Sequence, residues 1–184
     1  GQMWERCADR VRANAEGDLA NQQFYFDGKS VTLFNRDKNV YATLEAPGTI
    51  EEALDYAQNA FDLSAPLADL IYPDAYNVLT QNVHSGHYVG LHLVRGIQCH
   101  HLVFVQDDID WQIWIENSQT PLPRKMVITS KTLNSAPQYT LQVKEWKTDV
   151  TPVPDAFTFT PPAGASTLSP EALIELDELP PGAE

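Results

Sequence analysis

Hydrophobic and polar residues alternate along much of the chain up to Leu44, which is the pattern of strands with one buried face. Four segments alternate in this way: 10–15, 22–26, 30–34 and 40–44. Asp27-Gly28 separates the second segment from the third and is a strong signal for a two-residue hairpin turn. The sequence therefore predicts an antiparallel meander at the start of the chain.

The periodicity becomes helical after Pro47-Gly48. Thr49 is a good N-cap, and five apolar residues then recur at helical spacing: Ile50, Ala53, Leu54, Ala57 and Phe61. A helix is predicted over 49–61, a short helical piece through Leu67, Leu70 and Ile71, and another from Pro73 to about Leu79. We expect this helical lid, about 49–79, to pack on the sheet or cap its concave face, because its apolar side needs cover.

Strand patterns resume after Asn82 and continue for most of the remaining chain. Gly86 and Gly90 interrupt the alternation of the long segment 83–94, so we expect either one long strand or a strand with a bulge. Further strands are predicted at 97–104, 110–116, 124–129, 139–147 and 157–159. Residues 166–184 are interpreted as an acidic C-terminal tail that solvates this end of the chain, with one helical turn around 171–176.

These elements predict a mainly β fold with a helical lid (α+β), in which antiparallel strands curl into a half-barrel. We expect a single half-barrel domain over residues 1–165, since 184 residues suit one domain. No internal repeat is evident.

The amino-acid composition argues against several classes of binding partner. The net charge is −13, from 25 acidic against 12 basic residues, which argues against binding to nucleic acid or to anionic lipid surfaces. No segment approaches the roughly 20 apolar residues of an integral membrane span. Gly1–Trp4 lacks the basic and apolar regions of a signal peptide, so we expect an exported protein to appear here in mature or trimmed form.

Apolar side chains on the predicted strands are the strongest candidates for a binding site. Trp111, Ile113 and Ile115 share one face of their strand, as do Leu102 with Phe104 and Met126 with Ile128 in the flanking strands. They form either packed core or the wall of an apolar cavity, where acyl chains would need few polar anchors. The cavity hypothesis names Leu54, Phe61, Leu67, Leu70, Ile71, Leu102, Phe104, Trp111, Ile113, Met126 and Ile128. Arg124 could extend its guanidinium to the rim.

All five histidines fall between residues 84 and 101: His84, His87, His92, His100 and His101. His100 and His101 would point to opposite faces of a strand, so they cannot share one metal ion. A bulge at Gly86 could bring His84 and His87 together, and His92 could pair across to the neighbouring strand. No paired zinc pattern occurs. We interpret the histidines as hydrogen-bonded or exposed strand residues and predict no metal site.

The sequence offers no convincing catalytic group. Cys99 and His100 would face opposite ways, whereas Cys99 and His101 share a face at the limit of reach. No nucleophile elbow or phosphate-binding glycine loop is present, and Asp107-Asp108 fits a hairpin turn better than a calcium loop. We therefore predict no enzyme activity, no catalytic residue and no cofactor. Cys7 and Cys99 permit one disulfide without requiring it.

Several blocks resemble a known family. They are 26–34, 37–42, 46–50, 66–70, 96–102, 110–115, 121–125 and 157–165. In this order they resemble the predicted periplasmic domain-of-unknown-function family numbered 2092, which is similar to the lipoprotein-carrier superfamily of the LolA and LolB type. The resemblance implies a periplasmic, Gram-negative setting and a half-barrel with a helical lid over an apolar cavity. It also implies a hydrophobic ligand such as an acyl chain or lipoprotein.

The resulting hypothesis is a periplasmic, non-enzymatic protein that holds a hydrophobic small molecule or lipoprotein. The alternative is an envelope sensor or scaffold that binds a protein partner on its curved sheet. Family members normally have a helix and a strand before the segment matching 10–12. A barrel without that helix would be partly uncovered, which favours a homodimer or an exchange of strands between copies.

Overall fold

The computed structural model describes residues 2–6, 9–16, 21–46, 48–61, 70, 72, 74–149, 151–153 and 155–178. The chain divides into two compact units, residues 1–73 with 151–184 and residues 74–150, and each is described by itself. Strands dominate both units within the described residues, so the predicted mainly β class is confirmed. The single domain predicted for 1–165 stays a prediction.

The first unit is built on a sheet in the order β1-β2-β3-β4-β5-β11. Its strands are β1 (Gln2–Arg6), β2 (Arg10–Glu16), β3 (Asn21–Phe26), β4 (Ser30–Asn35), β5 (Val40–Glu45) and β11 (Ser166–Thr167). The strands β2 to β5 form the predicted antiparallel meander. β1, where no strand was predicted, pairs antiparallel with β2, and β11 adds in parallel to β5. The hairpin turn is confirmed too: Asp27 Oδ1 accepts the backbone N–H groups of Lys29 and Ser30, while Gly28 adopts a φ of 93°.

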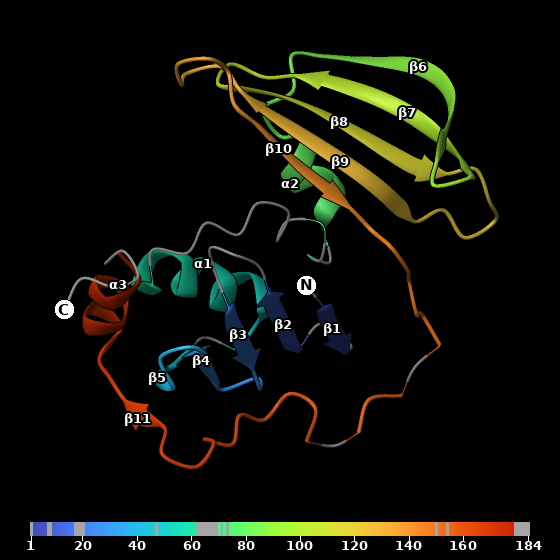
Figure 1. Cartoon of the computed structure of the whole chain (residues 1–184). Coiled ribbons are helices and arrows are strands. Elements are labelled where there is room, and N and C mark those ends of the chain that lie inside the picture. The colour runs from blue at the N-terminus through green and yellow to red at the C-terminus, as the bar shows by residue number, and fades with distance from the viewer. Residues whose placement is uncertain are drawn as a thin grey trace. The chain divides into compact units, whose positions relative to one another are not determined.

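One face of this sheet packs against α1 (Ile50–Phe61) and α3 (Pro170–Glu178) (Figure 1). The pairing register aligns Val11, Phe26 and Val31 on that face, and all three are fully buried. The α1 residues Ile50, Ala53, Leu54, Ala57 and Phe61 complete the core. Thr49 caps α1 as predicted: its Oγ1 accepts the Glu52 N–H and donates to the Glu52 carboxylate.

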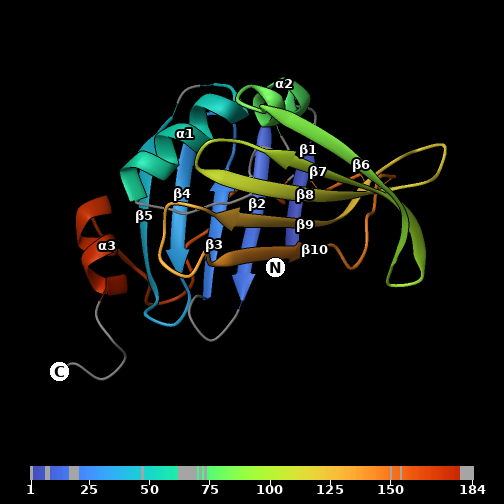
Figure 2. The same ribbon diagram turned by 90° about the horizontal axis from the view of Figure 1, so that it is seen from above.

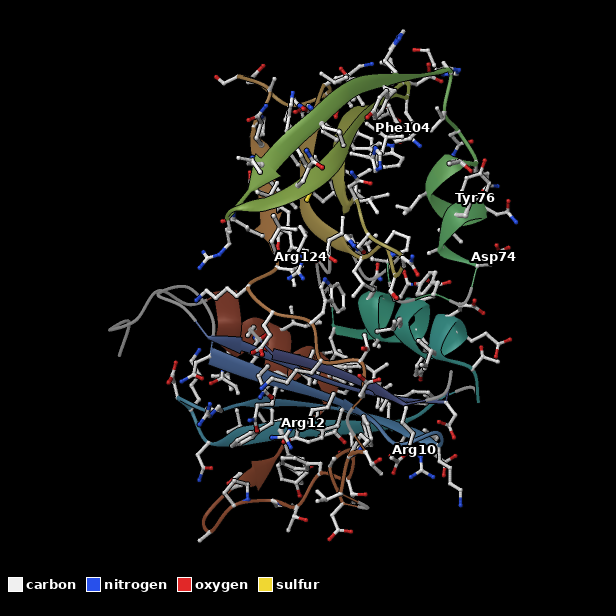
Figure 3. All side chains as sticks on the ribbon, turned by 90° about the vertical axis from the view of Figure 1, so that its right-hand side faces the viewer. Arg10, Arg12, Asp74, Tyr76, Phe104 and Arg124 are labelled. Carbon is white, nitrogen blue, oxygen red and sulfur yellow. The ribbon has the colours of Figure 1, made fainter. Side chains whose placement is uncertain are left out.

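The opposite face of the first sheet is covered by residues 155–161, which run along the side away from α1 (Figure 1). The Phe159 ring lies 5.0–5.4 Å from the rings of Tyr25, Phe34 and Tyr41. Arg12 points to this side (Figure 3), and its guanidinium donates to the carbonyl of Ala156. The strand predicted at 157–159 is wrong: the aromatic residues alternate and pack, but Phe157 ends a turn and the segment joins no ladder.

The segment from residue 166 differs from the predicted solvated tail. Ser166 and Thr167 pair with β5, and α3 contacts both α1 and β5. Leu173 of α3 is only 1% exposed and belongs to the core. The acidic residues dominate the sequence pattern here, yet the helix needs only its few apolar positions to dock.

The second unit contains an antiparallel sheet in the order β10-β9-β8-β7-β6, preceded by the short helix α2 (Ala75–Thr80). Its strands are β6 (Ser85–Val94), β7 (Ile97–Val105), β8 (Ile109–Glu116), β9 (Pro123–Ser130) and β10 (Gln138–Gln142), which lie side by side in Figures 1 and 2. The predicted bulge is confirmed between Tyr88 and Gly90. The last strand ends at Gln142, short of the predicted Lys147.

Within the described residues, no helix is long and apolar enough to cross a membrane.

Candidate functional site

Six of the predicted cavity residues meet on one face of the second sheet, which we call the apolar face. The register places Phe104 opposite Trp111 and Trp111 opposite Ile128. In the next row, Leu102 lies opposite Ile113 and Ile113 opposite Met126. Directly paired residues of antiparallel strands point to the same side, so three adjacent strands present these six side chains together.

The apolar face combines buried and half-exposed side chains. The rings of Phe104 and Trp111 stack with centroids 4.1 Å apart. Trp111 is 3% exposed, and Ile113 and Met126 are also buried, whereas Leu102, Phe104 and Ile128 are half-buried. Water is therefore largely excluded from the middle strand, which favours contact with apolar atoms.

Gly86 matters to this face because it lies opposite Phe104. A Cβ at this position would meet the Phe104 ring at 3.1 Å, closer than ordinary contact. The glycine that interrupts the sequence alternation of β6 therefore makes room for the aromatic stack rather than forming the bulge. Phe104 on β7 and Arg124 on β9 both belong to this sheet (Figure 3).

Arg124 was expected to reach a rim in solvent. Instead, its guanidinium pairs with the carboxylate of Glu116, and both side chains are largely buried. Pairing and burial together hold this cation in place more firmly than an exposed surface pair would.

The remaining predicted cavity residues lie apart from the apolar face. Leu54 and Phe61 belong to the packed core of the first unit. Leu70 is half-buried, and Leu67 and Ile71 lie outside the described residues. Cys7 also lies outside them, while Cys99 is a free, buried cysteine.

The opposite face of the second sheet carries a polar cluster. His101 is 7% exposed, and its Nδ1 lies 3.2 Å from Nδ1 of His92. Its Nε2 lies 2.9 Å from the amide oxygen of Gln112, and its ring stacks on Trp114 at 4.0 Å. Lys125 Nζ lies 4.5 Å from the Trp114 ring centre. Sequence reasoning foresaw that His92 could pair across strands, but not this partner.

The other cysteine and histidine contacts fit structural roles. Burial, followed by the negative charge of Glu116, raises the pKa of Cys99 and disfavours a reactive thiolate. His100 Nε2–H donates a hydrogen bond to the amide oxygen of Asn117, and His100 Nδ1 lies 3.0 Å from the Tyr88 hydroxyl. His84 pairs with Asp107 at 2.8 Å. Among the described residues, no group of three or more His, Cys, Asp or Glu side chains could hold a metal ion.

The His101 environment predicts a pH dependence of stability. Burial, the nearby His92 and Lys125 lower the pKa of His101, and they outweigh the hydrogen bond that His101 donates to the Gln112 amide oxygen, which raises the pKa. Because the folded pKa lies below the unfolded value of about 6.5, stability is full above that value. The stability that His101 contributes is lost as the pH falls from about 6.5 toward the pKa of His101 in the folded protein. Urea unfolding at pH 7.5 and pH 5.5 should show this loss, and His101→Phe should reduce it; an unchanged pH dependence in the variant would contradict the assignment.

A small pocket on the first unit was missed by sequence reasoning. It has a volume of about 200 Å³ and lies between the sheet and the segment 157–161. Tyr25, Tyr41, Phe157 and Phe159 give it aromatic walls, and Thr32 and Thr43 add hydroxyl groups that hydrogen-bond each other at 2.8 Å. The alternation of Phe157 and Phe159 was the available signal, but it was assigned to a strand.

Comparison with known proteins places these features in a family. No curated protein matches the chain. The family model for predicted periplasmic proteins named DUF2092 matches residues 1–169, which confirms the resemblance to that family and the periplasmic location. The further similarity to the lipoprotein carriers stays a prediction. The chain therefore belongs to the DUF2092 family of predicted periplasmic proteins.

Proposed function

We propose that this periplasmic protein is a non-enzymatic binding protein that holds a hydrophobic ligand, an acyl chain, lipid or lipoprotein, against the apolar face. The observation that carries the proposal is the alignment of Phe104, Trp111 and Ile128 with Leu102, Ile113 and Met126 across three strands. A hydrocarbon chain on this face would exchange water for aromatic and aliphatic contacts.

The expected energetics suit a carrier. Each ligand methylene removed from water contributes about 0.8 kcal/mol, so a long acyl chain can bind without polar contacts along its length. The half-buried Leu102, Phe104 and Ile128 are the members of the face that retain exposed surface for such contact. Trp111, Ile113 and Met126 lie beside them on the same face and are buried.

The lipoprotein-carrier architecture belongs to the same proposal. Its support is the family membership, the two sets of antiparallel strands and the packing of α1 on the first sheet. A half-barrel with a helical lid, in one domain, is the arrangement that the resemblance implies. The proposal requires no cofactor and no nucleic acid.

Uptake of a fluorescent fatty acid by delipidated protein tests this function. We expect saturable binding, with the fluorescent fatty acid displaced by unlabelled fatty acid, because a defined apolar face has limited room. Val127→Ala changes the opposite face of the sheet and should leave the uptake unchanged. A signal that rises without saturation, or that resists displacement, would contradict the proposal.

A second candidate, an envelope scaffold that binds a protein strand, is favoured by β6. This edge strand contains no Asp, Glu, Lys or Arg, although such charges usually protect a sheet edge. Leu93 is 73% exposed, and Tyr88, Val89 and Leu91 are also exposed. A partner strand, including β6 of a second copy, could add to this edge. Absent fatty-acid uptake together with dimeric sedimentation would favour this candidate.

A further inference from the structure

The face of the second sheet opposite the apolar face brings two imidazoles together. His92 lies on β6 and His101 on the adjacent β7, and their Nδ1 atoms are 3.2 Å apart. His92 is exposed, whereas His101 is buried, so the pair has one open side. Both strands are long and paired through this region, which fixes the spacing of the two backbones.

Neighbouring groups set the tautomer and orientation of His101. The Gln112 amide oxygen can only accept a hydrogen bond, so the His101 Nε2, 2.9 Å away, carries the hydrogen. The lone pair of this neutral ring is then on Nδ1, facing His92. The Trp114 ring stacks on His101 with an interplanar angle of 12°, which holds the imidazole plane. This arrangement matches the second-layer support of a metal-bound histidine.

We propose that His92 and His101 bind one divalent transition-metal ion, with Cu(II) preferred, through their two Nδ1 atoms. Two nitrogen ligands at about 2.0–2.1 Å from one ion lie about 2.9 Å apart in square-planar and about 3.4 Å apart in tetrahedral geometry. The observed 3.2 Å falls between these values. Imidazole suits copper, and Cu(II) has the highest affinity of the first-row divalent ions.

Metal binding at this site requires one hydrogen of His92 to move from Nδ1 to Nε2. Without metal, the Nδ1–H of His92 donates to the lone pair of His101 Nδ1. On metal binding, that hydrogen leaves Nδ1 and His92 takes the tautomer with hydrogen on its Nε2, so both Nδ1 lone pairs bind the ion.

The site is an exchangeable one rather than a structural one. It supplies two protein ligands, and water would complete the coordination on the exposed side of His92. This is consistent with the lack of any three-residue metal group among the described residues. The site lies on the other face from the proposed lipid contact, so the two proposals can fail independently.

Titration of the full chain with Cu(II) alone, followed by calorimetry and electron paramagnetic resonance, tests the site. We expect one bound ion whose spectrum shows two nitrogen ligands at pH 7.5. His92→Ala should abolish this binding while circular dichroism shows an intact fold, because His92 is exposed. Gln112→Met keeps both ligands but removes the acceptor, and should weaken binding by about 10- to 100-fold.

His84→Ala is the matched control, since this exposed histidine pairs with Asp107 away from the cluster. It should leave the copper affinity and spectrum unchanged. No one-to-one binding in the natural chain, binding that survives in His92→Ala, or a loss as large in His84→Ala would each overturn the proposal.

Discussion

Leu173→Ala is expected to lower the free energy of unfolding of the first unit by about 2–5 kcal/mol. Leu173 is 1% exposed and packs in one core with the α1 residues and the strands of the first sheet. Removing its side-chain atoms would leave a cavity between α3 and the core, because the sheet and α1 can relax only in part. Hydrogen exchange in peptides covering β4 and β5 should accelerate accordingly.

Glu175→Ala on the same helix is the control. Glu175 is exposed, so the exchange of β4 and β5 should remain close to that of the natural chain. Unchanged exchange in Leu173→Ala would show that residues 166–178 do not stabilise the first unit and would restore the interpretation of a solvated tail.

Trp111→Ala is expected to abolish fatty-acid uptake and to destabilise the second unit by about 3–5 kcal/mol. Its ring is buried and stacks on Phe104, at the centre of the apolar face. Loss of the indole would open a cavity at the centre of the face and leave Phe104, which retains exposed surface for ligand contact, without its stacking partner. Fluorescence titration measures the uptake, and urea unfolding measures the stability.

Trp114→Ala separates binding from stability. Trp114 lies on the same strand, is also buried and faces the other way, where it stacks on His101. We expect a comparable loss of stability but retained uptake at temperatures where the variant is folded. Equal loss of uptake in both variants would mean that binding depends on the integrity of the sheet rather than on the apolar face.

Local signals predicted most of the secondary structure. The Asp27-Gly28 turn, the Thr49 cap and the helical spacing from Ile50 to Phe61 each depend on neighbouring residues, and all appear in the structure. Period-two alternation likewise located β7, β8 and β9 and predicted which residues share a face within each strand; the register then aligns Phe104, Trp111 and Ile128 across the three strands. Such features are local or follow from the strand pleat, so a sequence is sufficient to recognise them.

Features that depend on tertiary contact were harder to predict. Leu173 is one apolar residue in an acidic segment, and its docking depends on a core that the segment itself does not reveal. Phe157 and Phe159 have strand-like alternation, but they pack against rings of the first sheet without joining a ladder. In both cases the periodicity indicates that a side chain is buried, but it does not indicate which residues that side chain packs against.

The candidate sites also combine features that the sequence predicts with features that depend on the register of the sheet. Strand geometry correctly separated His100 from His101, which lie on opposite faces. The close approach of His92 to His101 depends on the register after the bulge, which pairs His92 with Cys99 and His101 with Gly90. A one-residue change in that register would move His92 to the other face.

Photocrosslinking with a diazirine-bearing fatty acid tests the proposed function most directly, because it reports both binding and location. Delipidated protein is labelled, digested and mapped by mass spectrometry, with excess unlabelled fatty acid as competitor. We expect competitor-sensitive adducts on β7, β8 and β9, at residues of the apolar face such as Leu102, Phe104 and Ile128. Labelling that the competitor does not reduce, or that is confined to the first sheet, would contradict it.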